Sequence, residues 1–321
     1  MKQLCQPSTD RISNLPPNVM ERILTFLPIK EAGRTSILST KWRFSWRNIP
    51  RLVFDGDFAS VSSGKYQYVL FKIVTDILEA LKLHDGPITE FVLAIPGLQT
   101  SARVDLLIRH LNKKGVKKLD LHFYDHNPFH GNVNASLFHA IQLTCLKLRG
   151  CRLPEAGLKV FTSLTVLELS TAAVPFDFFH TFLPKKCPFL QELRVSDCLV
   201  PPKLRLVAPY LKNVSPFWME AQGQAPAIPR QEVLSVSAES EGYPENEDGC
   251  FQCLREVRIL GSHGSQLELD VLKFVLAKAA LLRRVVIKPS DELGCELGLR
   301  FLKEVTQYRR VSKDAEVIYV V

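Results

Sequence analysis

The sequence predicts an α/β protein in which a small helical module is followed by an array of parallel strands and helical return segments. Three observations support this prediction. A leucine pattern recurs along the chain, apolar residues with helical spacing occupy positions 19–27, and strand and helix patterns alternate again after residue 250. With 321 residues, the chain is long enough to bury more than one core.

The composition is that of a folded globular chain, with 46% hydrophobic and 23% charged residues. Residues 1–11 are too polar for a secretory signal, and no later segment is apolar for long enough to span a bilayer. We therefore expect a protein of the cytosol, the nucleus or both, with no membrane partner.

The net charge of +8 is concentrated at the N-terminus, because residues 1–55 hold nine Lys or Arg and only four Asp or Glu. Such a basic region suits nucleic acid or an acidic protein. Since the sequence contains no nucleic-acid reading motif, we expect an acidic protein partner and no nucleic acid.

Eight cysteines are scattered along the chain without the spacing of a disulfide framework. Cys250 and Cys253 form the only C-x-x-C pair, whereas a structural zinc site needs four ligands. We therefore expect no metal and no other cofactor.

Residues 14–51 have the pattern of short helices joined by tight turns. Leu15-Pro16-Pro17 suits the start of a first helix, and Pro28 ends it because proline cannot continue a helix. The first helix carries one apolar stripe, formed by Val19, Met20, Ile23, Leu24 and Leu27. A module of about 40 residues barely holds its own core, so we expect it to dock on a partner.

Three segments of this module resemble the plant F-box: Asn14-Leu15-Pro16-Pro17, Ile23 to Glu31, and Thr35 to Arg43 with Trp46. The resemblance implies binding to an acidic Skp-type adaptor and, through it, to a cullin. The implied adaptor-binding residues are Leu15, Pro16, Ile23, Leu24, Leu27, Pro28 and Trp42. The alternative for each of them is a place in the module's own core. Gly33 departs from the family pattern, in which a larger aliphatic residue is commoner.

The recurring pattern is that of a leucine-rich repeat. Leu143-x-x-Leu146-x-Leu148-x-x-Cys151-x-Leu153 fits that template throughout, and further copies start at Ile88, Val116, Leu164, Leu190, Leu254 and Leu282. The gap after Leu190 is too long for one repeat. We therefore expect irregular coils near Leu211-x-x-Val214 and near Val233 to Val236.

Alternate residues of each strand should form a buried ladder, made here by Leu146, Leu148, Leu167, Leu169, Leu193 and Val195. Cys151 and Cys198 should be inward-facing turn residues. The residues between the ladder positions face outward, and we expect the target to bind there, at Lys147, Arg149, Glu168, Glu192, Arg194 and Arg258. Arg149 and Arg194 are the strongest candidates, because a guanidinium can make paired hydrogen bonds with a carboxylate or phosphate.

The return segments have helical spacing in two places, at Val104, Leu107, Ile108 and Leu111 and at Phe176, Phe179, Phe182 and Leu183. After Cys250 the pattern predicts a strand at 254–260, a helix with Leu269, Leu272, Val275, Leu276 and Ala279, a further strand, a helix at 299–308 and a last strand at 317–321.

This C-terminal block resembles the FBD module of plant F-box proteins, through Leu267-Glu268-Leu269, Leu272 to Ala277, Arg309 to Ser312 and Ala315 to Tyr319. We expect it to close the solenoid. The predicted division is therefore an F-box at 10–55, leucine-rich repeats at 56–249 and an FBD-like region at 250–321.

These resemblances imply a non-catalytic substrate-recognition subunit of a Skp-cullin-F-box ubiquitin ligase. The alternatives are a repeat scaffold without ligase function and a small-molecule-gated receptor of the same architecture. An enzyme is disfavoured, because Asp120, His122, Asp125 and His126 lie at a strand end without a nucleophile motif nearby.

Overall fold

The computed structural model describes residues 10–56, 66–123, 133, 142–154, 161–175, 178–198, 210–218, 251–262, 264, 266–290 and 295–320. The chain forms two compact units, Met1–His126 and Asn127–Val321.

The first unit begins with a module of short helices. They are α1 (Pro17–Thr25), α2 (Ile29–Arg34) and the 3-10 helices η1 (Thr35–Ile37) and η2 (Ser45–Asn48). Pro17 lies in the first turn of α1, and Pro28 is the N-cap of α2, so the two prolines set the starts of both helices. The Trp42 indole nitrogen donates a hydrogen bond to the Ile12 carbonyl (3.1 Å) and thereby fastens the preceding chain to the module.

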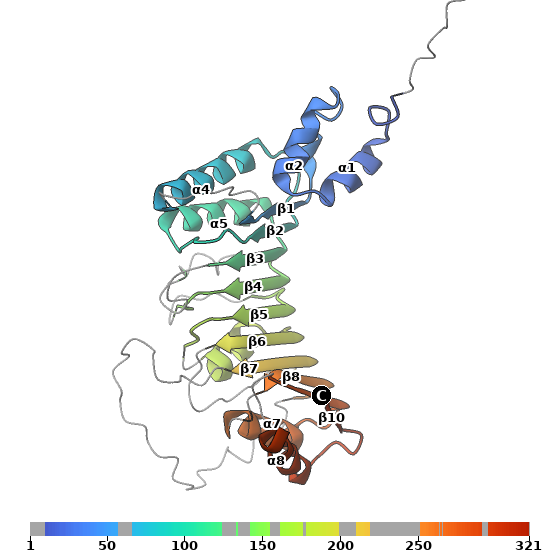
Figure 1. Cartoon of the computed structure of the whole chain (residues 1–321), viewed down its shortest axis with the longest axis vertical. Coiled ribbons are helices and arrows are strands. Elements are labelled where there is room, and N and C mark those ends of the chain that lie inside the picture. Colours follow the sequence, from blue (N-terminus) through green and yellow to red (C-terminus); the bar gives the residue numbers. More distant parts are fainter. Residues whose placement is uncertain are drawn as a thin grey trace, which may run out of the picture. The chain divides into compact units, whose positions relative to one another are not determined.

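Three parallel strands follow in this unit: β1 (Arg51–Phe54), β2 (Glu90–Leu93) and β3 (Lys118–His122). Helices α4 (Tyr66–Leu83) and α5 (Ala102–Lys114) are the return segments after β1 and β2, and they lie side by side (Figure 1). The coil containing β1 was not predicted. It nevertheless has the repeat frame, because Ile49, Leu52 and Phe54 are all buried.

Helix α5 confirms the predicted helical return segment. The Ser101 hydroxyl caps its N-terminus by accepting a hydrogen bond from the Val104 amide, and Gly115 ends it with φ 76°. Its buried residues are the predicted Val104, Leu107, Ile108 and Leu111.

The described residues of the second unit form seven strands: β4 (Cys145–Arg149), β5 (Val166–Ser170), β6 (Glu192–Cys198), β7 (Asn213–Trp218), β8 (Glu256–Ser262), β9 (Arg284–Pro289) and β10 (Glu316–Tyr319). Each pairs in parallel with the next, and Figure 1 shows β4 to β7 stacked in one direction. The predicted fold class, helices followed by a parallel leucine-rich-repeat region, is therefore confirmed.

The predicted ladder is buried along its length. In register, Leu146 lies beside Leu167 and Leu167 beside Leu193, while Leu148 continues the second row. All six predicted ladder residues, Leu146, Leu148, Leu167, Leu169, Leu193 and Val195, are buried. The sheet thus has one apolar side and one side of outward residues.

The chain turns sharply after β4, β5 and β6. Gly150, Thr171 and Asp197 have φ values of 67°, 50° and 52°, and each is followed by a fully buried small residue. Two of those small residues are Cys151 and Cys198, and the Cys198 thiol lies 3.5 Å from the Leu169 carbonyl of the neighbouring coil. Burial raises the pKa of both thiols to about 12, so they stay protonated and act in packing, as predicted.

Other predictions need correction or stay open. The return segment before β6 is a π-helix, η4 (Phe178–Phe182), followed by α6 (Leu183–Lys186), and not one regular helix. Phe178 and Phe182 stack at 4.9 Å between ring centroids, which shows that aromatic packing shapes this turn. The irregular coil near Leu211 exists and contains β7, whereas Val233 to Val236 lie outside the described residues.

The C-terminal part contains α7 (Gln266–Lys278) and α8 (Cys295–Gln307), which begins earlier than predicted, and β10, which begins at Glu316. Residues of the C-terminal motifs make structural contacts. Buried Ser262 donates to the Glu268 carboxylate (3.1 Å), the Arg310 guanidinium donates to the Ala315 carbonyl (2.9 Å), and Ser312 donates to the Leu282 carbonyl (2.6 Å). Residues of these motifs therefore form hydrogen bonds within the C-terminal part of the chain.

In the described part of the chain, no helix is long and apolar enough to cross a membrane. Among the same residues, no group of three or more His, Cys, Asp or Glu side chains could hold a metal ion. Cys253 is half-buried, and Cys250 lies outside the described residues.

Candidate functional site

Helix α1 has two apolar faces with different exposure. Val19, Ile23 and Phe26 are spaced by four and three residues, so they share one face, and all three are exposed. Phe26 keeps 78% of its surface accessible. Met20 and Leu24 are buried within the module, so the single stripe predicted from the sequence is in fact divided.

A second group of exposed apolar side chains comes from η1 and the residue after it. Ile37 is 88% exposed, and Leu38 is also exposed. We call Val19, Ile23, Phe26, Ile37 and Leu38 the N-terminal apolar surface. With Ile12 and Phe44, seven large apolar side chains of this small module are exposed. Such exposure is typical of a protein-binding site, where a partner would bury these side chains.

The seven predicted adaptor-binding residues do not share one environment. Pro16 and Ile23 are exposed, and Leu15, Leu27 and Pro28 are half-buried. Leu24 and Trp42 are 0% and 2% exposed, so they lie in the module's own core. Phe26, Ile37 and Leu38 were not predicted as contact residues, although the spacing of Phe26 from Val19 and Ile23 could have revealed it.

Basic side chains surround the helices of this module. Arg22, Lys30, Lys41 and Arg43 are exposed, whereas the Arg34 guanidinium forms an ion pair with Glu31 at 3.0 Å. The module therefore combines apolar and basic groups, which suits an acidic protein partner.

The outward side of the first unit's strands carries paired charges. Arg51 on β1 donates to Glu90 on β2 at 2.9 Å, and the Lys118 ammonium lies 3.9 Å from the same carboxylate. On β3, the Nε2 atom of His122 lies 2.9 Å from the Asp120 carboxylate. Asp125 and His126 lie outside the described residues, so the cluster suggested by the sequence is reduced here to this one pair.

We call the outward residues of β4 to β9 the repeat face. Glu168 on β5 pairs with Lys147 on β4 (3.1 Å) and with Arg194 on β6 (3.5 Å), and Arg194 also pairs with Glu192 on its own strand. Opposite charges thus alternate across three neighbouring strands. These pairs are partly exposed, so each one contributes little to stability.

A second charge cluster on the repeat face joins β8 and β9. Glu256 accepts hydrogen bonds from Arg258 and, at 3.0 Å, from Arg284. The Glu256 side chain keeps only 13% of its surface accessible, while both guanidinium groups remain about half exposed. This cluster presents one net positive charge to solvent.

All six predicted target-binding residues lie on the repeat face, but their charges are not equally available. Arg194 is occupied by two carboxylates. Arg149 is exposed, and no ion pair among the described residues involves it. It lies in register with Ser170, whose hydroxyl is 2.8 Å from that of Ser196 on the next strand. Arg149 is therefore the more available guanidinium.

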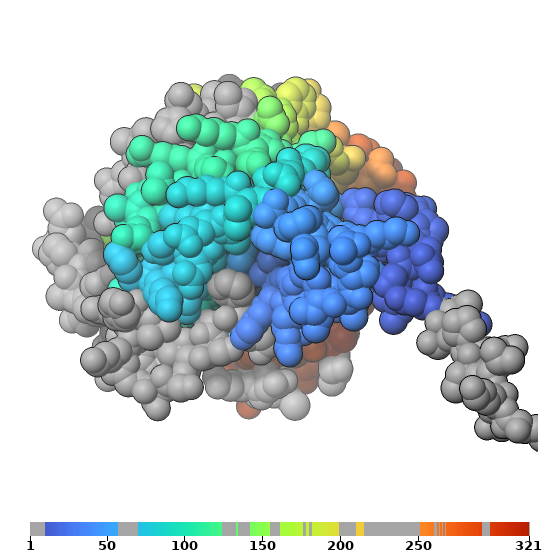
Figure 2. Space-filling view, turned by 90° about the horizontal axis from the view of Figure 1, so that it is seen from above, coloured from blue at the N-terminus to red at the C-terminus, as the bar shows by residue number. Residues whose placement is uncertain are grey.

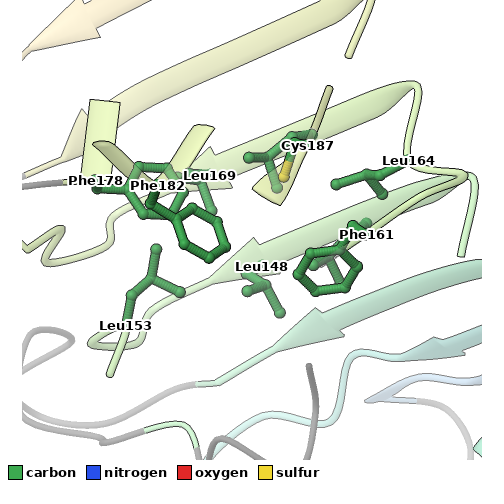
Figure 3. A pocket seen from close by; sticks show the side chains of 10 residues that line it. Leu148, Leu153, Phe161, Leu164, Leu169, Phe178, Phe182 and Cys187 are labelled. Atoms are coloured by element: carbon green, nitrogen blue, oxygen red, sulfur yellow. The ribbon is translucent and has the colours of Figure 1, made fainter. Parts of the chain in front are cut away.

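One small cavity lies on the inner side of β4 and β5 (Figure 3). Its volume is only about 10 Å³, and its walls are leucine and phenylalanine side chains with Cys187. A space of that size holds at most one water, and water needs polar partners that these walls do not provide. The cavity is therefore a packing void and not a ligand site.

Comparison with known proteins gives two matching family models. The F-box domain model matches residues 12–54. The model described as "FBD-associated F-box protein At5g56370, LRR repeats" matches residues 104–236. The chain is therefore similar to plant F-box/FBD/LRR-repeat proteins over these two ranges. The part of this match that precedes β1, residues 12–50, is called the F-box from here on.

Curated relatives from Arabidopsis thaliana agree with this family. The chain is 37% identical to F-box/FBD/LRR-repeat protein At1g13570 over 207 residues, which is 64% of this chain and 48% of the relative. It is 33% identical to F-box/LRR-repeat protein At2g42720 over 201 residues, 59% of this chain and 44% of the relative. The chain spans about half the length of the curated relatives it matches. The division at 10–55, 56–249 and 250–321 stays a prediction.

Proposed function

We propose that this protein is the substrate-recognition subunit of a Skp-cullin-F-box ubiquitin ligase. Its F-box binds the Skp-type adaptor, the adaptor links it to a cullin, and the repeat face binds the target protein. The observation that carries this proposal is the N-terminal apolar surface, which lies on the segment that matches the F-box model. The basic surplus of residues 1–55 favours an acidic adaptor.

The adaptor contact is built from exposed and half-buried residues. Pro16 and Ile23 supply accessible apolar area, and Leu15, Leu27 and Pro28 lie at the edge of the same helices. Leu24 and Trp42 act from within by holding the helices in place. Burial of a large apolar side chain contributes about 1.5–3 kcal/mol, so a few such residues account for a stable contact.

The protein itself performs no chemistry in this proposal. In the ligase, the amine of a target lysine attacks the thioester carbonyl that joins ubiquitin to a conjugating enzyme. An amide bond forms, the carbon–sulfur bond breaks, and the enzyme's thiol leaves with the proton of the amine. The receptor accelerates this step by holding the lysine near the thioester.

The test is co-purification of the full chain with a Skp-type adaptor. We expect the wild-type chain to capture the adaptor and the double variant Leu15→Ala/Pro16→Ala to lose capture while the repeats stay folded. Leu106→Ala is the matched control, because Leu106 is an exposed apolar residue of α5 outside the F-box. Equal capture by the double variant and the control would refute the docking model.

The target-binding part has its own test, with both guanidinium groups reversed in charge. We expect Arg149→Glu/Arg194→Glu to reduce ubiquitination of the target without changing adaptor binding, because the repeat face lies outside the F-box. Loss of neither activity, or equal loss of both, would exclude this face as the selecting surface. Arg149→Glu alone should have the larger effect, since Arg194 is already neutralised by Glu168 and Glu192.

The alternatives are weighed by the same observations. A repeat scaffold without ligase function would not co-purify with the adaptor. A small-molecule-gated receptor gains no support from the cavity behind β4 and β5, because a volume of about 10 Å³ excludes any organic ligand.

A further inference from the structure

The F-box is tied to the first repeat coils by a turn between α4 and β2. We call residues 47–50 the exit segment and residues 84–90 the clamp turn. The amides of Asp85 and Gly86 both donate to the Arg47 carbonyl, at 3.0 and 3.2 Å. The Thr89 amide donates to the Pro50 carbonyl at 2.8 Å. The clamp turn is therefore hydrogen-bonded to both ends of the exit segment.

His84 adds a side-chain contact to these backbone bonds. Its ring is 2% exposed, with Nε2 at 2.9 Å from the Ile49 carbonyl and Nδ1 at 3.1 Å from the Gly86 carbonyl. Burial lowers the pKa of His84 and so favours the neutral ring, which still has one N–H to donate. One buried ring thus lies between the exit segment and the clamp turn.

Gly86 allows the two segments to approach closely. A Cβ atom at this position would lie 3.0 Å from the Asn48 Cα and 3.2 Å from the Asn48 carbonyl oxygen. Both of these are backbone atoms, so they cannot rotate away as a flexible side chain could. A Cβ at position 86 would therefore require the Asn48 backbone to move by a few tenths of an ångström.

Helix α5 supports the clamp turn from the side of the repeats. The Lys114 ammonium at the end of α5 donates to the His84 carbonyl at 2.7 Å. The exit segment leads directly into β1. Ile49 of the exit segment and Leu52 of β1 are both buried. Figure 2 shows the surface of the F-box (blue) adjoining that of α4 (cyan). No free linker separates the F-box from the first strand.

We propose that His84 and Gly86 are positioning residues that fix the F-box to the first repeat coils as one rigid body. This inference rests on the proposed ligase function and adds a requirement to it. The F-box is held by the adaptor, so a rigid exit segment determines where the coils of β1 to β3 lie relative to the ubiquitin thioester. The working unit then extends from the F-box through β3, and a boundary at residue 55 divides it.

The variants are Gly86→Ala, which crowds the Asn48 backbone, and His84→Gln, which removes the ring without adding volume. Gly33→Ala is the matched control, because a Cβ at Gly33 in α2 would meet no atom within 4 Å. All three are made in the full chain. Thermal unfolding first establishes which of them fold.

The first measurement is the distance distribution between two probes, introduced as noncanonical amino acids at exposed Arg22 on α1 and Arg109 on α5. We expect one narrow distribution for the wild type and for Gly33→Ala, and a broader one for Gly86→Ala and His84→Gln. If Gly86→Ala fails to fold, His84→Gln decides the outcome. A distribution as narrow as that of the wild type would overturn the proposal.

The second measurement uses the chain's own lysines as ubiquitin acceptors in a complex reconstituted with adaptor, cullin and conjugating enzyme. Exposed Lys30 and Lys41 precede the exit segment, whereas exposed Lys82, Lys113 and Lys117 follow it. Among these later lysines, one should accept ubiquitin fastest in the wild type. Loss of the contact between the clamp turn and the exit segment should lower the transfer rate at that lysine by about tenfold, because small misplacements of a reacting group are costly in rate. Transfer to Lys30 and Lys41, and the affinity for adaptor, should stay within about twofold of the wild type.

A merely structural role for His84 and Gly86 would lower transfer to all lysines and adaptor binding together, so this split separates the two explanations. If the variants still capture the adaptor and transfer ubiquitin to the lysines beyond the exit segment at wild-type rates, the positioning role is refuted. Failure of the wild-type chain to bind the adaptor would instead refute the proposed function itself.

Discussion

The F-box and the repeat face expose opposite kinds of surface. The F-box leaves large apolar side chains such as Phe26 and Ile37 uncovered, and it also exposes basic side chains such as Arg22 and Lys41. The repeat face keeps its apolar residues inside and presents charges already paired with one another, as in Lys147, Glu168 and Arg194. Apolar area binds a partner strongly with little discrimination, whereas a paired-charge surface binds only a partner that matches its pattern. This contrast suits one constant partner and one selected partner.

The largest expected effect comes from truncating an inward-facing residue of a strand and comparing it with an outward-facing residue of the same strand. Leu148→Ala should lower the free energy of unfolding by about 2–5 kcal/mol, because it leaves a cavity in the ladder. Lys147→Ala on the same strand should change it by less than about 0.5 kcal/mol. Denaturant unfolding of both variants measures the difference. Similar losses would mean that the two faces of β4 are not distinct.

A second prediction compares the exposed and the buried apolar face of α1. Phe26→Asp should weaken adaptor binding at least tenfold, since it places a charge on an apolar contact, and it should leave folding intact because Phe26 is exposed. Leu24→Ala should destabilise the F-box, because Leu24 is buried. Binding titration with adaptor and thermal unfolding separate the two effects. Normal adaptor affinity in Phe26→Asp would remove this residue from the contact.

The spacing of apolar residues in the sequence predicts which face of a helix or strand is apolar, but it does not predict what covers that face. This is why the strand ladder was predicted correctly: alternate residues such as Leu146 and Leu148 can only be inside when their neighbours are charged. The stripe of α1 was ambiguous, because Ile23 and Leu24 are adjacent in the sequence and equally apolar. Only the packed structure shows that Leu24 is covered and Ile23 is not.

The strand β1 and the clamp turn were missed for different reasons. Ile49, Leu52 and Phe54 follow the repeat frame, but they directly continue the helical module, so their pattern was assigned to it. The clamp contact joins His84 to Ile49 across 35 residues, and no local pattern encodes such a pair. Contacts such as this one cross the division predicted at residue 55.

A third prediction concerns acid. Burial is the main cause that lowers the pKa of both His84 and His110 in the first unit, and nearby Lys114 adds to the effect at His110. The unfolded chain therefore binds more protons than the folded one below the ordinary histidine pKa of 6.5, and stability should fall as the pH drops through that value. Unfolding curves between about pH 8 and 5 measure the slope. The double variant His84→Gln/His110→Gln should flatten it, and an unchanged slope would assign the acid sensitivity to other groups.

The smallest expected effect on stability tests the paired charges of the repeat face. Glu168→Gln keeps the shape of the side chain but removes its charge, so Lys147 and Arg194 lose a shared partner. We expect a loss of about 0.2–1 kcal/mol at low salt that disappears near 1 M salt, because partly exposed ion pairs are weak and screened. The same change adds one net positive charge to the face, so capture of a target with an acidic patch should increase while adaptor binding stays constant. Lys212→Ala is the control, since Lys212 is exposed and its ammonium group bonds, among the described contacts, only to the neutral Gln191 side chain. A large, salt-insensitive loss of stability in Glu168→Gln would show that the charge network supports the fold and does not primarily shape recognition.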